Sequence, residues 1–238
     1  MSASANRSPQ PRGLLTLPEQ IAERIYSDIV EGHYHPGDRI REEAIAVALG
    51  VSRGPVREAL RILERDAVVR LLPNRGAHVT KLSVREVNDV FEIRAVLAGA
   101  MARRLATRGR DVVARLEDGV QELERLATRV EDGGQYVAAS VRLAQRMAQA
   151  TGNDRLADIM RSLARQSWRY TLLTLADAKR RRASARRWRT VFGALLAGDA
   201  DRAGQLMESL VDESRREAMR VLGAATQPQA PARIQPEA

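Results

Sequence analysis

Three arginines stand four residues apart, at Arg53, Arg57 and Arg61, within the segment VSRGPVREALRIL. In an α-helix this spacing places them along one face, where their guanidinium groups point to solvent or to a ligand. Apolar residues with i, i+3, i+4 and i+7 spacing form a second face, which packs on a core: Val56, Ala59, Leu60 and Leu63. An α-helix fits the major groove of DNA, and arginine donates two hydrogen bonds to guanine O6 and N7. The chemistry indicated is base recognition by Arg53 and Arg57.

The arginine helix follows another predicted helix, EEAIAVAL, after a turn of three residues. Gly50 can adopt the left-handed conformation that ends the first helix, and Ser52 is a favourable N-cap for the second. Two helices joined by so short a turn are typical of a helix-turn-helix. We predict that Ser52 and the backbone amides at the N-terminus of the second helix bind a phosphate. The alternative is a structural role, in which the arginines pair with nearby acids such as Glu58, Glu64 and Asp66.

Two short strand-like runs follow, at residues 68–72 and 77–81, with a Pro-Asn-Arg-Gly turn between them. This pattern predicts a β-wing, with Arg75 and Gly76 at its tip entering the minor groove. Upstream, Thr16 and Glu19 have the spacing of a capping box and open a helix that ends before the Pro36 turn. Residues 15–81 are therefore predicted to be a winged helix-turn-helix domain.

Composition favours two domains and excludes several classes of protein. The chain has 238 residues, of which 44% are hydrophobic, enough for two cores. It has no cysteine, which excludes disulfides, thiolate metal sites and thiol catalysis. We find no apolar run near the roughly 18 residues of a membrane span and no signal-peptide pattern, so a cytoplasmic location without membrane association is expected. The net charge of +9 is weak evidence for DNA binding, because residues 1–80 hold 11 arginines against 10 acidic residues.

The second predicted domain, residues 82–223, is all helical. Ser83 and Glu86 repeat the capping-box spacing and open its first helix. Further helices are expected at about 111–129, 135–151, 154–178, 184–197 and 200–222, separated by glycine-containing breaks and an arginine-rich bend. The run from Lys179 to Arg187 is interpreted as a solvated loop and helix start, with an anion contact as the alternative. Residues 1–14 and 224–238 are rich in small residues, Pro and Gln and are expected to be disordered tails.

Two segments resemble a known family. The run from Pro36 to Val69, followed by the wing pattern P-x-R-G-x-x-V at 73–79, is similar to the DNA-binding domain of GntR-type transcriptional regulators. The R-x-x-L motif at 94–97, Gly152-Asn153 and the A-L-L-A-G-D motif at 194–199 resemble the FCD effector domain of the FadR branch. This implies a mainly α protein, with a winged helix-turn-helix before a six-helix FCD-like bundle, and a homodimer on an inverted-repeat DNA operator. Gly54 departs from the family, where a hydroxyl residue commonly precedes the proline.

The resemblance also implies where a metal would be bound, and this chain lacks the ligands. Many FCD domains hold a divalent metal with one Asp and three His. The corresponding positions here are Ser140, Ala144, Trp188 and Leu210. All three histidines, His33, His35 and His78, lie in the first domain, so no metal and no other cofactor is predicted for the helical domain. For His33 and His35 a solvated structural role is favoured over metal binding.

The same four positions and Arg94 are predicted to line an effector pocket. Arg94 matches a family arginine that holds a carboxylate; an ion pair within the domain is the alternative. Ala98 stands where the family usually has Glu, and Trp188 either relines the pocket or partly fills it. Trp168 and Trp188 are more typical of core packing than of ligand stacking. A small effector is expected, such as an organic acid or an apolar anion.

These inferences favour a sequence-specific DNA-binding transcriptional regulator, a repressor rather than an activator, whose operator affinity responds to an effector in a metal-free helical domain. The alternative is an effector-independent DNA-binding protein whose helical domain only dimerises. An enzyme is not expected, because the helical domain has no Cys or His and no carboxylate pair stands out as an acid and base couple.

Overall fold

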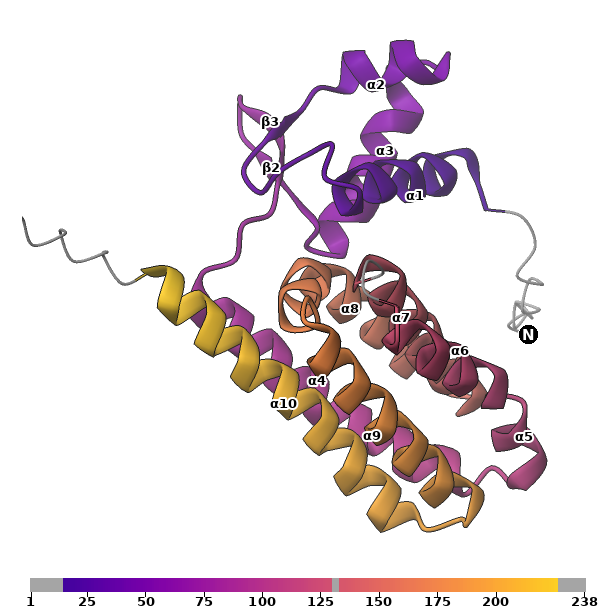
Figure 1. Cartoon of the computed structure of the whole chain (residues 1–238). Coiled ribbons are helices and arrows are strands. Elements are labelled where there is room, and N and C mark those ends of the chain that lie inside the picture. Colours follow the sequence, from indigo (N-terminus) through magenta and orange to yellow (C-terminus); the bar gives the residue numbers. More distant parts are fainter. Residues whose placement is uncertain (1–14, 130–132, 227–238) are drawn as a thin grey trace, which may run out of the picture. The chain divides into compact units, whose positions relative to one another are not determined.

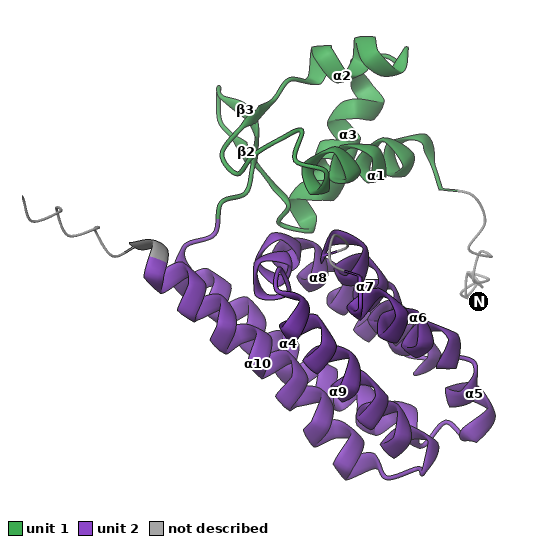
Figure 2. Ribbon diagram, in the orientation of Figure 1, with its two compact units in different colours: residues 1–81 green, residues 82–238 purple. Residues whose placement is uncertain are grey.

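A computed structural model describes residues 15–129 and 133–226 (Figure 1). The chain divides into two compact units, residues 1–81 and 82–238 (Figure 2). Of the tails expected to be disordered, residues 1–14 and 224–238, the parts at 1–14 and 227–238 lie outside the described residues. None of the described helices is long and apolar enough to cross a membrane.

The first unit is a winged helix-turn-helix with a three-stranded antiparallel sheet in the order β1-β3-β2. Its elements are α1 (Leu17–Val30), β1 (Arg39–Ile40), α2 (Glu42–Leu49), α3 (Arg53–Arg65), β2 (Val69–Leu72) and β3 (Gly76–Val79). The predicted capping box is present at the start of α1, where Glu19 Oε2 accepts from the backbone N–H of Thr16 at 2.7 Å. Gly50 ends α2 with φ +64°, and Ser52 is the N-cap residue of α3. This turn fixes how α2 meets α3.

Strand β1 was not predicted from the sequence. Arg39 pairs with His78 and Ile40 with Ala77, so a two-residue strand covers the edge of β3. Two residues are too few to show a period of two, which is why no pattern indicated this strand. Ile40 is 1% exposed and belongs to the core that α1 and α3 form with the sheet. β1 thereby joins the loop before α2 to the wing.

The second unit is helical throughout its described residues. Its elements are α4 (Val84–Ala106), α5 (Arg110–Ala114), α6 (Glu117–Ala127), α7 (Gly133–Ala150), α8 (Asp154–Thr174), α9 (Ala178–Leu196) and α10 (Ala200–Thr226). The long helices α4 and α10 lie side by side (Figure 1). Gly99 and Gly204 make this close contact feasible, because a Cβ at either position would overlap the side chain of Glu208 or Arg103. Those two side chains form an ion pair of 2.8 Å between the helices.

The described residues contain seven helices in this unit rather than the six predicted. The single helix expected at 111–129 is broken into α5 and α6 at Arg115 and Leu116. Leu116 is 4% exposed, and the carbonyl of Arg115 accepts a hydrogen bond from Arg146 on α7. A buried leucine and a donor from another helix therefore compensate the break, and neither is visible in the local sequence.

The arginine-rich segment 179–187 also differs from its prediction, which was a solvated loop followed by a helix start. It is helical, because α9 begins at Ala178 behind the N-cap Asp177, whose carboxylate accepts from the amide of Lys179 at 2.9 Å. Other boundaries shift less: α8 ends at Thr174, α7 includes Gly133 and Gly134, and α10 continues to Thr226 into the predicted tail.

Candidate functional site

The recognition surface of the first unit is centred on α3. Val56, Leu60 and Leu63 are fully buried under this helix, whereas Arg53 and Arg57 are exposed on it. Ser52 takes the N-cap position but its side chain makes no capping hydrogen bond. The N-terminal amides and the Ser52 hydroxyl thus lie at the positive end of the helix dipole, an arrangement that suits a phosphate.

Two arginines of α3 make ion pairs within the unit. Arg57 Nη2 lies 3.1 Å from Glu42 Oε2 on α2, and Arg61 Nη1 lies 3.4 Å from Glu58 Oε2. Glu58 is one of the partners that the sequence suggested, but Glu42 is not. The carboxylate of Glu64 accepts instead from the backbone N–H of Leu71 at 3.0 Å and so ties α3 to the wing. Exposed pairs of this kind contribute roughly 0 to 1 kcal/mol, so they do not prevent an arginine from meeting a base.

A depression of about 760 Å³ adjoins the start of α3. It brings Arg53 and Gly76, both predicted DNA contacts, together with Arg39 and Arg41, which the sequence analysis missed. The Arg39 side chain lies 3.6 Å from where a Cβ on Gly76 would stand. Strand β1 is the feature that would have identified Arg39, because the pairing of β1 with β3 places Arg39 beside the wing.

The wing turn has two residues in the left-handed region, Asn74 at φ +59° and Gly76 at φ +81°. Arg75 between them is exposed, as a minor-groove contact requires. His78 lies close to two carbonyl oxygens, that of Gly37 at 3.1 Å from Nδ1 and that of Arg75 at 3.3 Å from Nε2. The imidazole thereby joins the wing turn to the loop before β1.

Among the described residues, one group of His, Asp and Glu has its ligand atoms within 4.8 Å of one another: Asp28, Glu31 and His33, at the end of α1. Arg24 Nε already lies 3.1 Å from Asp28 Oδ1, and His33 Nδ1 is 3.6 Å from the same oxygen. We interpret the group as a cluster of polar side chains at the surface, and a structural role for His33 stays the favoured interpretation. The predicted solvated role of His35 likewise stays a prediction; its backbone N–H donates to Asp38 at 2.7 Å.

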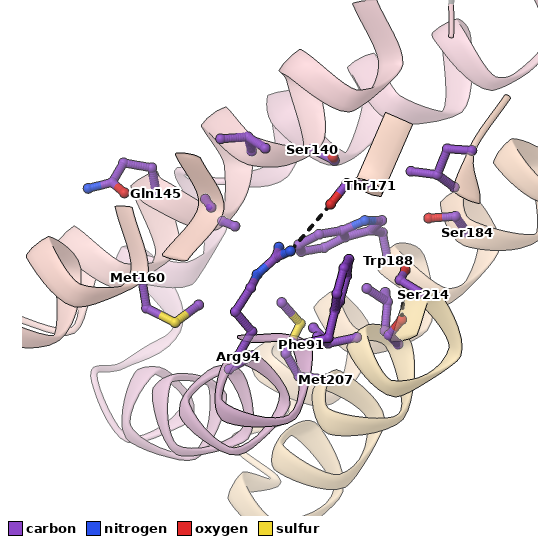
Figure 3. A pocket seen from close by; sticks show the side chains of 17 residues that line it. Phe91, Arg94, Ser140, Gln145, Met160, Thr171, Ser184, Trp188, Met207 and Ser214 are labelled. Atoms are coloured by element: carbon purple, nitrogen blue, oxygen red, sulfur yellow. Dashed lines mark hydrogen bonds between the residues drawn. The ribbon is translucent and has the colours of Figure 1, made fainter. Parts of the chain in front are cut away.

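The helical unit contains a cavity among α4, α7, α8, α9 and α10 (Figure 3). All five residues predicted for an effector pocket line it: Arg94, Ser140, Ala144, Trp188 and Leu210. Ala98 and Phe91 also contribute to its wall. About 50 Å³ is open to water, far below the roughly 300 to 1,000 Å³ of ligand pockets. Trp188 points into the cavity and is 4% exposed (Figure 3), so its indole occupies much of the space.

Arg94 supplies the positive charge in this cavity. Its Nη1 donates to the hydroxyl of Ser167 at 2.7 Å. It also donates to the hydroxyl of Thr171 at 3.3 Å (Figure 3), and both residues are on α8. The guanidinium carbon lies 5.1 Å from the centre of the Phe91 ring, a cation–π distance. The sequence analysis missed both hydroxyl residues, because nothing in the spacing of α8 relates them to an arginine on α4. A guanidinium that lines a cavity can hold an anionic ligand by charge-assisted hydrogen bonds.

The metal that the family resemblance implied does not fit this cavity. Ala144, Trp188 and Leu210 offer no ligand atom for a metal in their side chains. The Ser140 hydroxyl donates to the carbonyl of Val137 at 2.8 Å. The second tryptophan, Trp168, is not among the lining residues and packs against the core of the unit.

Two family models match the chain. The model described as FCD domain matches residues 89–213, and the model described as bacterial regulatory proteins, gntR family, matches residues 17–79. The HTH-type transcriptional repressor RspR of Escherichia coli K12 is 36% identical over 89 residues, which are 37% of this chain and 39% of RspR. The gluconate operon transcriptional repressor of Bacillus subtilis is 27% identical over 117 residues, 49% of this chain and 48% of that protein.

The matched region spans 35% to 55% of the length of the first two curated relatives. A solved structure covers more of the chain. It is described as a transcriptional regulator GntR from Rhodococcus sp. RHA1, and it aligns with 87% of this chain and 98% of its own at a TM-score of 0.70 and 26% identity. The likeness therefore extends across both units.

Proposed function

The chain belongs to the GntR family of bacterial regulatory proteins and carries an FCD domain, and from this we propose that it is a sequence-specific DNA-binding transcriptional repressor. The observation that carries the proposal is the arrangement of α3. This helix buries one apolar face, and it exposes Arg53 and Arg57 in its first two turns, at the positive end of the helix dipole. Repression rather than activation is supported by relatives described as repressors, RspR and the gluconate operon repressor. No catalytic role is proposed.

In this proposal α3 enters the major groove of an operator. Arg53 and Arg57 contact base edges, while Ser52 and the first amides of α3 bind a phosphate. Arg75 and Gly76 enter the adjacent minor groove. One recognition helix reads few base pairs, so a cytoplasmic homodimer on an inverted repeat supplies the selectivity.

The proposal is tested by replacing these arginines in the whole chain. Arg57→Ala is expected to cost about 1 to 3 kcal/mol of operator binding and to relax the preference at one position of each half-site. Arg75→Ala is expected to weaken binding with a smaller effect on sequence choice, because a minor-groove contact distinguishes bases less. Gel-shift titrations against an operator selected from random DNA measure both effects. If Arg57→Ala binds no more weakly than the parent chain, the proposed readout by α3 is wrong; if Arg75→Ala binds no more weakly, the wing makes no such contact.

We further propose that the cavity of the helical unit binds a small organic acid or apolar anion, without a metal. Arg94 would hold the anionic group, and the remainder of the ligand would be enclosed by Trp188, Leu210, Ala144 and Ser140.

Helix α8 connects this cavity to the start of the unit. The hydroxyl of Tyr170 on α8 accepts from the N–H of Leu82 at 3.2 Å and lies 3.3 Å from the carbonyl of that residue. Because Thr171 contacts Arg94, helix α8 connects the cavity to the first residue of this unit. A ligand that shifts α8 would thereby alter operator affinity through reciprocal linkage.

The absence of a metal from this mechanism is testable on the purified protein. Zinc, nickel or manganese should leave the melting temperature of the helical unit unchanged, because its native state offers no better ligands than the unfolded chain. A chelator should likewise leave operator binding unchanged. One tightly bound metal per helical unit, found by elemental analysis, would contradict the assignment of the four cavity positions.

A second function is favoured by one observation, the small free volume of the cavity. If Trp188 fills the space permanently, the helical unit serves only dimerisation and DNA binding is independent of any effector. The two functions differ in one measurement. A small carboxylate that changes operator affinity in the parent chain, but not in Arg94→Ala, would exclude the effector-independent protein.

A further inference from the structure

Glu42 is the first residue of α2, and its carboxylate contacts Arg57 on the recognition helix. Glu42 Oε2 lies 3.1 Å from Arg57 Nη2, and Glu42 Oε1 lies 3.5 Å from Arg57 Nε. Both nitrogens belong to the side edge of the guanidinium group, so the carboxylate holds that edge with two oxygens. The side chain of Glu42 is 24% exposed and that of Arg57 is 58% exposed. The acid is thus partly enclosed by the protein, and the arginine projects from it.

This geometry leaves the other edge of the guanidinium available. An arginine has five N–H donors in one plane, and Glu42 engages one on Nε and one on Nη2. The N–H groups that point away from Nε, on Nη1 and Nη2, form the end edge. Two parallel donors of this kind match guanine O6 and N7. A carboxylate on the side edge therefore restricts a long, mobile side chain while its base-reading edge stays accessible, which reduces the entropy lost on binding.

The charge of Glu42 has a second effect. A carboxylate on a surface that meets DNA repels the phosphates and lowers affinity for every sequence alike. That loss is recovered only where Arg57 finds a base that accepts two hydrogen bonds. A group that weakens all binding but favours one contact increases discrimination between sequences.

We propose that Glu42 is a positioning residue that makes Arg57 selective for guanine, an inference that rests on the proposed DNA-binding function. Glu42→Gln in the full chain tests it, because glutamine removes the charge and one of the two accepting oxygens. Affinity is measured for a selected operator, for operators substituted at each base pair, and for an unrelated duplex. The expected result is tighter binding to the unrelated duplex and a roughly tenfold loss of discrimination at one base pair of each half-site.

Glu43 provides a matched control. It is the next residue along α2, is exposed, and lines the same depression as Arg53, so Glu43→Gln removes an equal charge. It should strengthen binding to all duplexes alike and leave base preference unchanged. If Glu43→Gln relaxes base preference as much as Glu42→Gln does, charge alone accounts for the effect and the positioning role is overturned. Glu42→Asp keeps an acid at the start of α2, and its shorter side chain should lose the same discrimination in a chain that melts like the parent.

Arg57→Ala separates this inference from the function on which it rests. It should remove the preference at the base pair affected by Glu42→Gln, and the double variant should lose nothing more. If Arg57→Ala leaves operator binding unchanged, the proposed readout by α3 is wrong. If Arg57→Ala relaxes the preference but Glu42→Gln and Glu42→Asp keep it, only the role of Glu42 is overturned.

Discussion

Tyr136 holds a phenol in the core of the helical unit, where its side chain is 0% exposed. Burial raises its pKa from 10.0 to about 12. Since the folded state then favours the neutral phenol, this residue contributes its full stability below pH 10, the pKa of an exposed tyrosine, and loses it as pH rises towards 12. We expect ionisation of Tyr136 to lower the free energy of unfolding by on the order of 2 to 3 kcal/mol by pH 12. Tyr136→Phe should abolish this part of the alkaline decrease.

Urea midpoints between pH 9 and pH 11 measure this effect in the parent chain and the variant. The parent midpoint should fall more steeply above pH 10 than that of Tyr136→Phe. Parallel curves for the two proteins would mean that the Tyr136 phenol ionises in the folded state as readily as in the unfolded chain.

Residue types and spacing identified some single residues and not others. The two faces of α3 could be predicted, because a period of 3.6 is a property of the segment itself. The contact from Glu42 to Arg57 could not, since it joins residues fifteen positions apart on different helices. The five cavity positions were reached through the family resemblance. Their hydroxyl neighbours Ser167 and Thr171 follow only from the packing of α8 against α4. The role of each cavity residue stays a prediction.

At the scale of elements, Arg181 joins three helices. It is 1% exposed on α9, and its Nη1 donates to the carbonyls of Leu175 and Ala176, just after α8, at 3.0 and 2.6 Å. Its Nη2 donates to the carbonyl of Arg129, just after α6, at 3.0 Å. One guanidinium therefore satisfies carbonyls that the ends of two helices leave without an intrahelical donor.

Arg181→Met should destabilise the helical unit by about 3 kcal/mol or more, because methionine fills the space but leaves buried carbonyls without donors. Arg182→Met is the matched control, because Arg182 is the next residue of α9 and is exposed. This substitution should change the free energy of unfolding by no more than about 0.5 kcal/mol. Urea denaturation followed by circular dichroism compares them. Equal stability of the two variants would show that water replaces the guanidinium at those carbonyls.

Arg181 also explains why the sequence interpretation failed in this segment. A run of basic residues normally indicates a solvated surface, and among the basic residues of this segment only Arg181 is buried. The carbonyls that accept from Arg181 belong to residues just after α6 and α8, and the predicted ends of these two helices differ from the observed ends by a few residues. Element types were predictable from periodicity and caps, whereas helix ends and breaks depend on partners from elsewhere in the fold.

At the scale of the whole molecule, we expect the helical unit to hold the proposed dimer. Its first helix, α4, exposes Ile93 at 52% and Val96 at 61%, apolar surface that association can bury. A chain that begins at Leu82 should therefore sediment as a dimer at micromolar concentration. Ile93→Asp combined with Val96→Asp should shift the full chain towards monomer, since two carboxylates would be desolvated in each copy.

Ile159→Asp is the control for this experiment. Ile159 is 50% exposed on α8, so it resembles Ile93 in type and exposure but lies on another helix. It should leave the sedimentation coefficient unchanged. A monomeric chain from Leu82 onwards would place the association surface in the first unit, and a dimer lost only with Ile159→Asp would place it on α8.

The position of Trp188 in the cavity also gives the protein its own optical reporter. The chain has two tryptophans, and Trp168 lies outside the cavity wall. Replacing Trp168 by phenylalanine would leave a single indole, whose fluorescence depends on the polarity and contacts of its surroundings. Any small molecule that enters must displace or touch that ring, because the ring occupies the space. Candidate effectors could then be screened by emission alone, with no added dye and before the operator sequence is known.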